Sequence, residues 1–288
     1  MTRDTPFLQF HSVSYAYPPV DAEQVPPEQV PPEQAAEKPE NTPVFDYFSA
    51  GLPEGFVSLI GPNGSGKSTF LLLGGGRLLP SAGYVTLYDV DTRALTDENA
   101  RNLMCSFIYQ NMEFETPEQI GSLLEYVYVN GSHRSKDETF LKEIVSVFEL
   151  DALLNRSLTG ISKGEIQRTL LAFSLLYGSR CVFMDEPLFA LEDRQKEAAL
   201  EYLRSYSRDR KVPIYIAMHE LDLTRKYADT VLLFHPDRQM ELGTPAEVLT
   251  PESLEAAYGI PYGMLKDGEK LNRERLNEEA GLLAGRNE

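Results

Sequence analysis

The sequence has little cysteine, no tryptophan and no long apolar run. Its 288 residues include two cysteines, and no stretch reaches the roughly 20 apolar residues that a membrane-spanning helix needs. The first residues also lack the apolar core of a signal peptide. Cys105 and Cys181 each lie inside an apolar run, where a reduced cysteine behaves as a small hydrophobic residue. These absences predict a protein that stays in the reducing cytoplasm and reaches a membrane only through a partner.

Positive charge is also scarce. The 27 Lys and Arg residues are outnumbered by 44 Asp and Glu, which gives a net charge of −17 at pH 7. An acidic surface repels a phosphate backbone, so nucleic acid is not an expected partner. The apolar fraction of 42% is ordinary for a globular protein, and the length allows one large α/β domain with its own core.

Proline is concentrated in one segment. Residues 18–43 contain eight prolines and a tandem Val-Pro-Pro-Glu-Gln, and they follow a strand-like pattern at residues 7–17. Proline removes backbone donors, so this segment should be extended rather than helical or paired in a sheet. An enlarged hairpin loop and a binding arm are both open interpretations.

A complete phosphate-binding loop follows a short apolar strand predicted at residues 56–60. The sequence matches Gly-x4-Gly-Lys-[Ser/Thr], and a helix is predicted from about Lys67 that should end early at Gly74–Gly76. Backbone N–H groups of such a loop wrap phosphates, Lys67 neutralises the β and γ oxygens, and Ser68 can bind Mg²⁺. The sequence therefore predicts ATP and Mg²⁺ as ligands. The loop residues are Gly61, Pro62, Asn63, Gly64, Ser65, Gly66, Lys67, Ser68 and Thr69.

Strand and helix patterns alternate along the rest of the chain. Residues 84–88, 180–184 and 212–218 read as strands, whereas 119–156 and 170–177 have helical spacing. This alternation predicts an α/β fold with a mostly parallel sheet covered by helices.

Ionisable residues follow two of the predicted strands. Asp185 and Glu186 come directly after residues 180–184, and His219 follows residues 212–218. Open parallel sheets bind ligands at this edge, so one carboxylate can hold Mg²⁺ and the other can polarise an attacking water. Taken alone, the carboxylates would more often form a helix-capping turn and the histidine would be structural.

The segment from Thr159 to Arg168 permits two interpretations. Ser162 and Glu165 have the spacing of a helix capping box, which is a purely structural role. Gly164 beside this cap would also leave the helix N-terminus accessible to an anion.

Taken in order, these motifs make the chain resemble the nucleotide-binding subunit of an ATP-binding-cassette (ABC) transporter, from about Phe7 to Tyr258. Residues 219–259 are similar to importers of iron chelates, haem and cobalamin. The resemblance implies a P-loop NTPase fold of ABC type, with a mostly parallel core sheet, an antiparallel β-subdomain and a helical subdomain at about 111–175. Residues 1–262 would form one nucleotide-binding domain with 18–43 as an inserted loop, and residues 263–288 a charged tail without visible chemistry.

The resemblance also assigns roles to single residues. Glu186 corresponds to the catalytic glutamate, His219 to the switch histidine and Gln110 to the residue that touches Mg²⁺ and the attacking water. Tyr17 corresponds to the aromatic residue that stacks on adenine, with Tyr15 as the alternative. The expected catalytic residues are Glu186, His219, Gln110 and Lys67; the expected metal ligands are Ser68, Gln110 and Asp185. Nucleotide is expected to contact Tyr17 and residues 61–69 and, across a subunit interface, Ser162, Gly164 and Glu165.

Two departures from the family pattern concern communication between ATP sites. Residues 161–165 resemble the family's Leu-Ser-Gly-Gly-Gln signature, but Lys163 stands in place of its first glycine. Glu192 stands where an aspartate is usual. Lys163 adds positive charge near a phosphate, and the longer Glu192 side chain could loosen contact between two sites.

The resemblance implies several partners. One chain carries one phosphate loop and one signature, and in the family the signature of one subunit closes over ATP held by the other. We therefore expect ATP-dependent pairing, as a homodimer or with a homologous ATPase, at the cytoplasmic face of an integral membrane permease, with a solute-binding protein involved indirectly. The permease contact is expected at about 111–130, where Met112, Phe114 and Tyr126 line a cleft or are simply core. An ABC ATPase that acts on ribosomes or DNA is the alternative.

Overall fold

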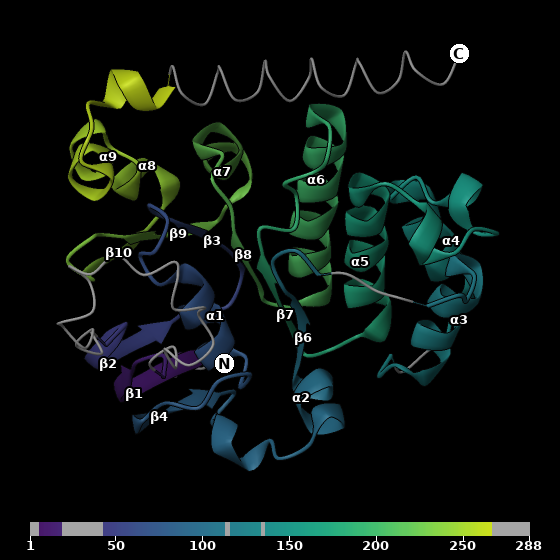
Figure 1. The fold of residues 1–288 in the computed structure, drawn as a ribbon, viewed down its shortest axis with the longest axis horizontal. Helices are drawn as coiled ribbons and strands as arrows, with labels where there is room; N and C mark the ends of the chain where they lie inside the picture. The colour runs from purple at the N-terminus through teal and green to yellow at the C-terminus, as the bar shows by residue number, and fades with distance from the viewer. Residues whose placement is uncertain (1–5, 19–42, 113–115, 134–135, 267–288) are drawn as a thin grey trace, which may run out of the picture.

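The computed structural model describes residues 6–18, 43–112, 116–133 and 136–266, which form two sheets and the helices around them (Figure 1). The proline-rich segment expected as an inserted loop lies almost entirely outside the described residues, as does most of the tail expected from residue 263. None of the described helices is long and apolar enough to cross a membrane.

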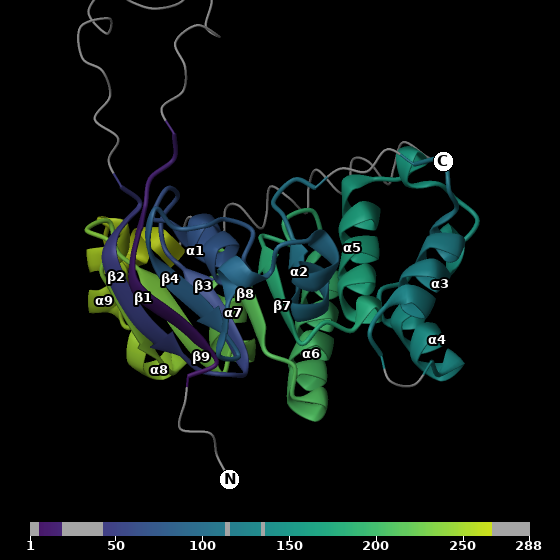
Figure 2. The ribbon, with the colours of Figure 1, turned by 90° about the horizontal axis from the view of Figure 1, so that it is seen from below.

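An antiparallel sheet forms one side of the molecule, on the left in Figure 2. Its strand order is β2-β1-β4-β5, and Leu8 of β1 pairs with both Leu52 and Leu87. Buried and more exposed residues largely alternate along β1, as expected for a sheet with one face on the core. The bounds are β1 (Leu8–Tyr15), β2 (Phe45–Leu52), β4 (Ala82–Leu87) and β5 (Val90–Asp91).

The central sheet has the order β10-β9-β3-β8-β7-β6, and all its pairs are parallel except β9 with β10. The mostly parallel sheet predicted from the sequence is thus confirmed. Strands β3, β7 and β8 are buried along their whole length. The bounds are β3 (Phe56–Ile60), β6 (Cys105–Ile108), β7 (Cys181–Asp185), β8 (Ile214–Ala217), β9 (Thr230–Phe234) and β10 (Met240–Gly243).

Helix α1 (Lys67–Gly74) packs between the two sheets and contacts strands of both. Phe70 on this helix stacks on Phe10 of the antiparallel sheet at 4.6 Å and meets Phe234 of the central sheet edge-on at 5.5 Å. The helix ends at Gly74, as the three consecutive glycines predicted. Because this packing fixes α1, it also fixes the glycine-rich loop that precedes it.

The remaining helices cover the central sheet or group at its β6 edge, where α3, α4 and α5 pack on one another (Figures 1 and 2). The region 119–156 that reads as helical in sequence is divided into α3 and α4, and α3 stops at Gly131. Helix α5 includes the predicted residues 170–177 and starts, as the sequence predicts, at the Ser162–Glu165 capping box; Gly178, at φ 78°, ends it. The grouping agrees with the expected helical subdomain, whose bounds stay a prediction. The bounds are α2 (Glu98–Met104), α3 (Ile120–Asn130), α4 (Glu138–Val147), α5 (Lys163–Tyr177), α6 (Asp193–Arg210), α7 (Leu221–Tyr227), α8 (Pro245–Val248) and α9 (Pro251–Tyr258); short 3₁₀ helices lie at Thr92–Ala94, Asp151–Leu153 and Leu158–Gly160.

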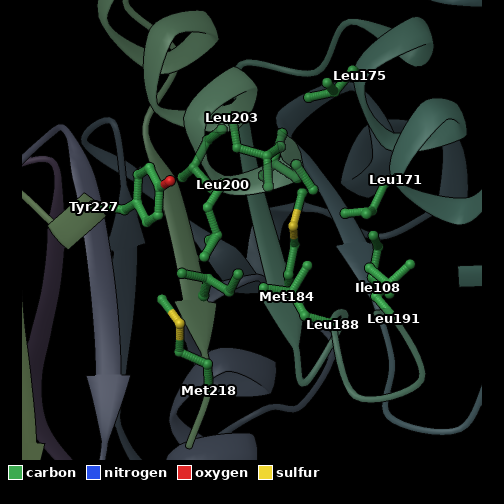
Figure 3. Close-up of a cluster of buried hydrophobic side chains, with 14 of the residues drawn as sticks. Ile108, Leu171, Leu175, Met184, Leu188, Leu191, Leu200, Leu203, Met218 and Tyr227 are labelled. Atoms are coloured by element: carbon green, nitrogen blue, oxygen red, sulfur yellow. The ribbon is translucent and has the colours of Figure 1, made fainter. Parts of the chain in front are cut away.

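The larger of two apolar clusters joins the central sheet to its helices (Figure 3). Met184 of β7 lies in this cluster with Leu171 of α5 and Leu200 of α6, and Leu188 and Leu191 lie at its lower right in the view. The residues just beyond β7 are therefore anchored on both sides of Asp185 and Glu186.

Candidate active site

The glycine-rich loop leaves β3 and enters α1 through backbone conformations that favour glycine. Gly61 has φ 150°, and a Cβ there would lie 2.7 Å from the carbonyl oxygen of Phe234. Gly66 has φ 102° and is the N-cap residue of α1. Residues with a side chain rarely adopt these angles, so the loop shape depends on both glycines.

Lys67 is buried at the start of α1. Its Nζ donates to the carbonyl oxygens of Gly61 at 2.7 Å and Pro62 at 3.0 Å. Burial lowers the pKa of Lys67, whereas the charges of Glu186 and Asp185 raise it. An ammonium held only by carbonyl dipoles in a buried position gains by moving onto fully charged phosphate oxygens. The role of Lys67 as a phosphate ligand stays a prediction, which this position favours.

Asp185, the last residue of β7, is 6% exposed, and its Oδ1 has no hydrogen-bond partner among the described residues. Burial raises the pKa of this carboxyl, and a hydrogen bond from Ser68 lowers it. The Oγ of Ser65 in the loop is likewise buried without a partner within the described ranges. A carboxylate oxygen such as Asp185 Oδ1 is a suitable ligand for Mg²⁺, and a hydroxyl such as that of Ser65 can donate to a phosphate.

Glu186 is held at both carboxylate oxygens. His219 Nε2 lies 2.7 Å from Oε1, and Gln110 Nε2 donates to Oε2 at 2.9 Å. The bond with His219 is the main cause that lowers the pKa of Glu186; burial opposes it, and the bond with Gln110 adds to it. Glu186 also has φ 50°, an uncommon angle for a residue with a side chain. Three residues that follow three neighbouring strands, β6, β7 and β8, thus meet in one hydrogen-bonded group.

Tyr17 is the aromatic residue that faces the loop. Its hydroxyl lies 3.0 Å from Thr69 Oγ1, and its ring meets Tyr15 edge-on at 5.1 Å. Tyr15 is 9% exposed and Tyr17 is 46% exposed. Tyr17, rather than the alternative Tyr15, is therefore accessible to a ligand, and its stacking on adenine stays a prediction.

One cavity of about 710 Å³ joins these features. From the sequence-predicted set it is lined by Tyr17, Asn63, Gly64, Gly66, Lys67, Ser68, Thr69, Gln110, Glu186 and His219. Gly61 and Pro62 contribute through their carbonyl bonds to Lys67. The residues that sequence reasoning missed are mostly apolar: Val44, Phe189, Leu221, Tyr258, Ile260, Met264 and Leu265. The prediction that the tail from residue 263 has no part in the site is therefore wrong for Met264 and Leu265.

The signature residues lie elsewhere. Ser162, Gly164 and Glu165 are not among the residues that line this cavity. Ser162 N–H donates to Glu165 Oε2 at 2.7 Å and Glu165 N–H to Ser162 Oγ at 3.3 Å, so the predicted capping box is present. Both Ser162 and Lys163 are exposed at the start of α5.

Helix α5, which begins with the signature residues, nevertheless contacts the loop that follows Glu186. Gln167 Oε1 accepts the N–H of Ala190 at 2.8 Å, and a Cβ at Gly164 would lie 2.7 Å from the carbonyl oxygen of Ala190. Further along this loop, Glu192 is the N-cap residue of α6, which gives the departure from aspartate a structural role. A shift of α5 would therefore move the chain segment that follows Glu186.

Comparison with known proteins identifies the family. Residues 49–189 match the ABC transporter family. A hemin import ATP-binding protein, HmuV of Pseudomonas entomophila, is 32% identical over 215 residues, which cover 72% of this chain and 83% of the relative. The chain belongs to the ABC transporter family. A cobalamin import ATP-binding protein, BtuD of Halobacterium salinarum, is 28% identical over 75% of this chain and 55% of the relative.

Solved structures support the same fold for this ABC protein. An inward-facing putative metal-chelate type ABC transporter matches with a TM-score of 0.64 and 19% identity, over 89% of this chain and 90% of that one. A dimeric bacterial ABC transporter cassette matches with a TM-score of 0.63 and 18% identity, over 79% and 94%. The fold is that of an ABC ATPase, and the chain is an ATP-binding, ATP-hydrolysing subunit of an ABC transporter.

Proposed function

We propose that this ABC ATPase works as one half of an ATP-dependent pair, in which the α5 N-terminus of one subunit completes the phosphate loop of the other. The separation of the two groups within one chain carries the proposal: Lys67, Glu186 and His219 line one cavity, and Ser162 lies outside it, exposed. The N-terminus of the 15-residue helix α5 attracts anions, and the exposed Lys163 adds positive charge there. A second copy of the chain would place both features over bound ATP.

Within each site, hydrolysis would proceed by attack of water on the γ-phosphorus. Glu186 accepts the proton of that water, while the bond from phosphorus to the bridging β-oxygen breaks and ADP leaves. The depressed pKa of Glu186 keeps its carboxylate ionised and ready to accept this proton. Gln110 and His219 orient the carboxylate, and Lys67 transfers from the Gly61 and Pro62 carbonyls to the phosphates.

The predicted metal ligands fit magnesium. Asp185 provides a buried carboxylate oxygen without a partner in the described part of the chain, and Ser68 lies beside it as a hydroxyl donor. With Gln110, these residues would hold a Mg²⁺ ion that neutralises charge on the β- and γ-phosphates. These residues offer oxygen atoms as ligands, which favours Mg²⁺ over softer metals.

Light scattering with ATP tests the pairing. Glu186→Gln should block hydrolysis without weakening nucleotide binding, so that the ATP-bound form accumulates. We expect this variant to move from the 32.4 kDa monomer to twice that mass when ATP is added. The double variant Glu186→Gln, Ser162→Asp should stay monomeric, because a carboxylate would then face the triphosphate. A monomer in both cases rejects the pairing.

We propose that the pair powers import of a metal chelate, porphyrin or corrinoid through a separate membrane permease, at the cytoplasmic face and with a solute-binding protein upstream. The proposal rests on the hemin and cobalamin import relatives and on the similarity of residues 219–259 to such systems. Reconstitution with a permease encoded beside this gene tests it. ATP turnover should rise severalfold in the presence of the permease and its loaded binding protein, and hemin and cobalamin arms would separate the cargo classes.

The competing function is an ABC ATPase that acts on ribosomes or DNA. The net charge of −17 disfavours contact with nucleic acid, and both relatives are named as import proteins. Co-sedimentation of the purified chain with ribosomes at physiological salt, together with unchanged turnover on adding the permease, would favour this alternative over transport.

A further inference from the structure

An apolar rim borders the nucleotide cavity and consists of Phe189, Ile260 and Met264. These three residues line the cavity, yet they are 60%, 41% and 64% exposed. With adenine expected at Tyr17, the remainder of ATP is ribose and phosphate, and phosphate groups do not shield apolar side chains from water. Large apolar side chains gathered at one place on a charged protein mark a surface that another molecule covers.

Phe189 belongs to a loop that is held on both sides. Leu188 and Leu191 are buried in the larger apolar cluster (Figure 3), whereas Phe189 between them is exposed. The N–H of Ala190 is bonded to Gln167 of α5 at 2.8 Å. Phe189 also lines a second cavity, of about 450 Å³, together with residues at the start of α5. The position of Phe189 is therefore tied to the N-terminal end of that helix.

Ile260 and Met264 belong to a short segment that is fixed by α7 and α9. The Tyr262 hydroxyl, between them in sequence, accepts a hydrogen bond from Arg225 of α7 at 2.9 Å. The N–H of Tyr262 donates to Glu255 of α9 at 2.8 Å. The segment is thus anchored to two helices while both of its rim residues stay exposed.

The charge of the chain gives such a surface a use in pairing. Two copies that each carry a net charge of −17 repel one another, and bound ATP adds further negative charge. Apolar contact supplies an attraction that does not depend on charge. The rim is also continuous with the cavity that the proposed pairing would cover. A second copy of this chain is therefore the occupant that the position of the rim favours.

We propose that Phe189 of each subunit packs against Ile260 and Met264 of the other, beside each ATP site. The inference rests on the proposed function, in which α5 of one subunit approaches the nucleotide cavity of the other. Because Phe189 is tied to α5, and because Ile260 and Met264 line that cavity, the same approach brings the apolar side chains together. A pair with two-fold symmetry forms this contact twice.

The rim shares no residue with the permease contact expected at residues 111–130. Met112 lines the 450 Å³ cavity, and Tyr126 of α3 is 66% exposed; neither is among the described residues that line the nucleotide cavity. Phe114 lies outside the described residues. Tyr126 therefore provides a matched control, an aromatic side chain about as exposed as Phe189 but outside the rim.

The test measures how tightly full-length chains pair when all of them carry Glu186→Gln and ATP is saturating. Sedimentation velocity gives the dissociation constant of each pair. Phe189→Ser, and separately the double exchange Ile260→Ser, Met264→Ser, should each weaken pairing with itself about a hundredfold, because two contacts worth about tenfold each are lost. Tyr126→Ser should pair like the Glu186→Gln parent.

A mixed pair distinguishes contact between subunits from contact within one. One chain carries Phe189→Ser and the other carries Ile260→Ser with Met264→Ser, each labelled with its own fluorophore. If the contact crosses the interface, the mixed pair keeps one of its two contacts and should be about tenfold tighter than either variant paired with itself. If Phe189 packs on its own chain, neither subunit keeps the contact and the mixed pair gains nothing.

The possible failures of the inference and of the proposed function are distinct. Undiminished pairing of either rim variant with itself, or a mixed pair no tighter than those two, overturns this assignment alone. Absence of an ATP-dependent pair in the Glu186→Gln parent overturns the proposed pairing and the inference together.

Discussion

The two halves of the catalytic machinery in this chain are built differently. Around Glu186, hydrogen bonds join side chains that lie 33 and 76 residues apart in sequence. Around Ser162, the hydrogen bonds join only residues of the same helical turn. The first group is assembled by the order of strands in the sheet and is complete within one subunit. The second is an exposed helix start with its local bonds satisfied, and under the proposed pairing it would act on the ATP of another subunit.

The two regions are nevertheless joined within one chain. The Gln167 contact with Ala190 places the signature helix against the loop that begins at Glu186. Under the proposed pairing, both sites of a dimer would respond, since each α5 would contact its partner's ATP as well as its own loop after Glu186. The predictions below are chosen to separate the two halves.

The largest effect is expected from Lys67→Ala. This substitution removes the buried ammonium predicted to face the phosphates, together with its hydrogen bonds to the loop carbonyls of Gly61 and Pro62, and ATP affinity should fall by at least about a hundredfold. Isothermal titration of ATP measures this directly. Lys142→Ala, at an exposed lysine on α4, should bind like wild type. Near-normal ATP affinity in Lys67→Ala would contradict the role of the loop in binding the phosphates.

Ser162→Asp should affect the other half alone. Aspartate is also a good N-cap residue, so α5 should remain stable, but its charge would repel ATP held by a second subunit. We expect turnover to fall about a hundredfold, a loss of the size seen on removing one stabilising donor, while ATP binding to the monomer is unchanged. Ser162→Thr keeps the hydroxyl and should retain most activity. Loss of monomer binding in Ser162→Asp would place the residue in its own chain's site.

His219→Ala should move the acid limb of the rate profile. The bond from His219 is the main cause of the low pKa of Glu186, so its loss lets burial raise that pKa. A larger fraction of Glu186 is then protonated at mildly acidic pH, so the acid limb of the kcat profile shifts to higher pH. The maximal kcat should also be lower. His11→Ala, on the antiparallel sheet, is the control. An acid limb that stays in place would show that Glu186 is not the titrating base.

The smallest effect concerns stability. The pKa of Asp185 is raised above its ordinary value of 3.8, so the folded chain binds this proton more tightly than the unfolded chain, and ionisation at neutral pH costs stability. Asp185→Asn should therefore raise the melting temperature of the nucleotide-free chain by a few degrees at pH 7, with the gain vanishing as the pH falls below 3.8. Asp151→Asn, at an exposed position, should leave the melting temperature unchanged at both pH values. A lower melting temperature for Asp185→Asn would show that its ionised form stabilises the fold.

Much of this arrangement was predictable because its signals are local. The loop motif, the Ser162–Glu165 capping box and the early end of α1 at Gly74 each depend on neighbouring residues, and each is present. The division of residues 119–156 into two helices was missed, although residues 131–137 contain a glycine and no apolar residue, which is the signal of a break between helices.

The convergence at Glu186 could not be derived from spacing. It depends on β6, β7 and β8 lying side by side, an order that the sequence states only through resemblance to a family. The contribution of Met264 and Leu265 to the nucleotide cavity was missed for a related reason: isolated apolar residues in a charged segment carry no periodic signal.

The central claim is that the phosphate loop of one subunit faces Ser162 and Lys163 of another, and cross-linking between chains tests it most directly. One chain would carry Asn63→Cys and the other Lys163→Cys, both with Glu186→Gln; the native Cys105 and Cys181 are buried and should not react. A short bis-maleimide should join the two chains when they are mixed with ATP and leave them separate without it. Absence of a cross-link with ATP, or a cross-link within a single chain that carries both cysteines, would contradict the account.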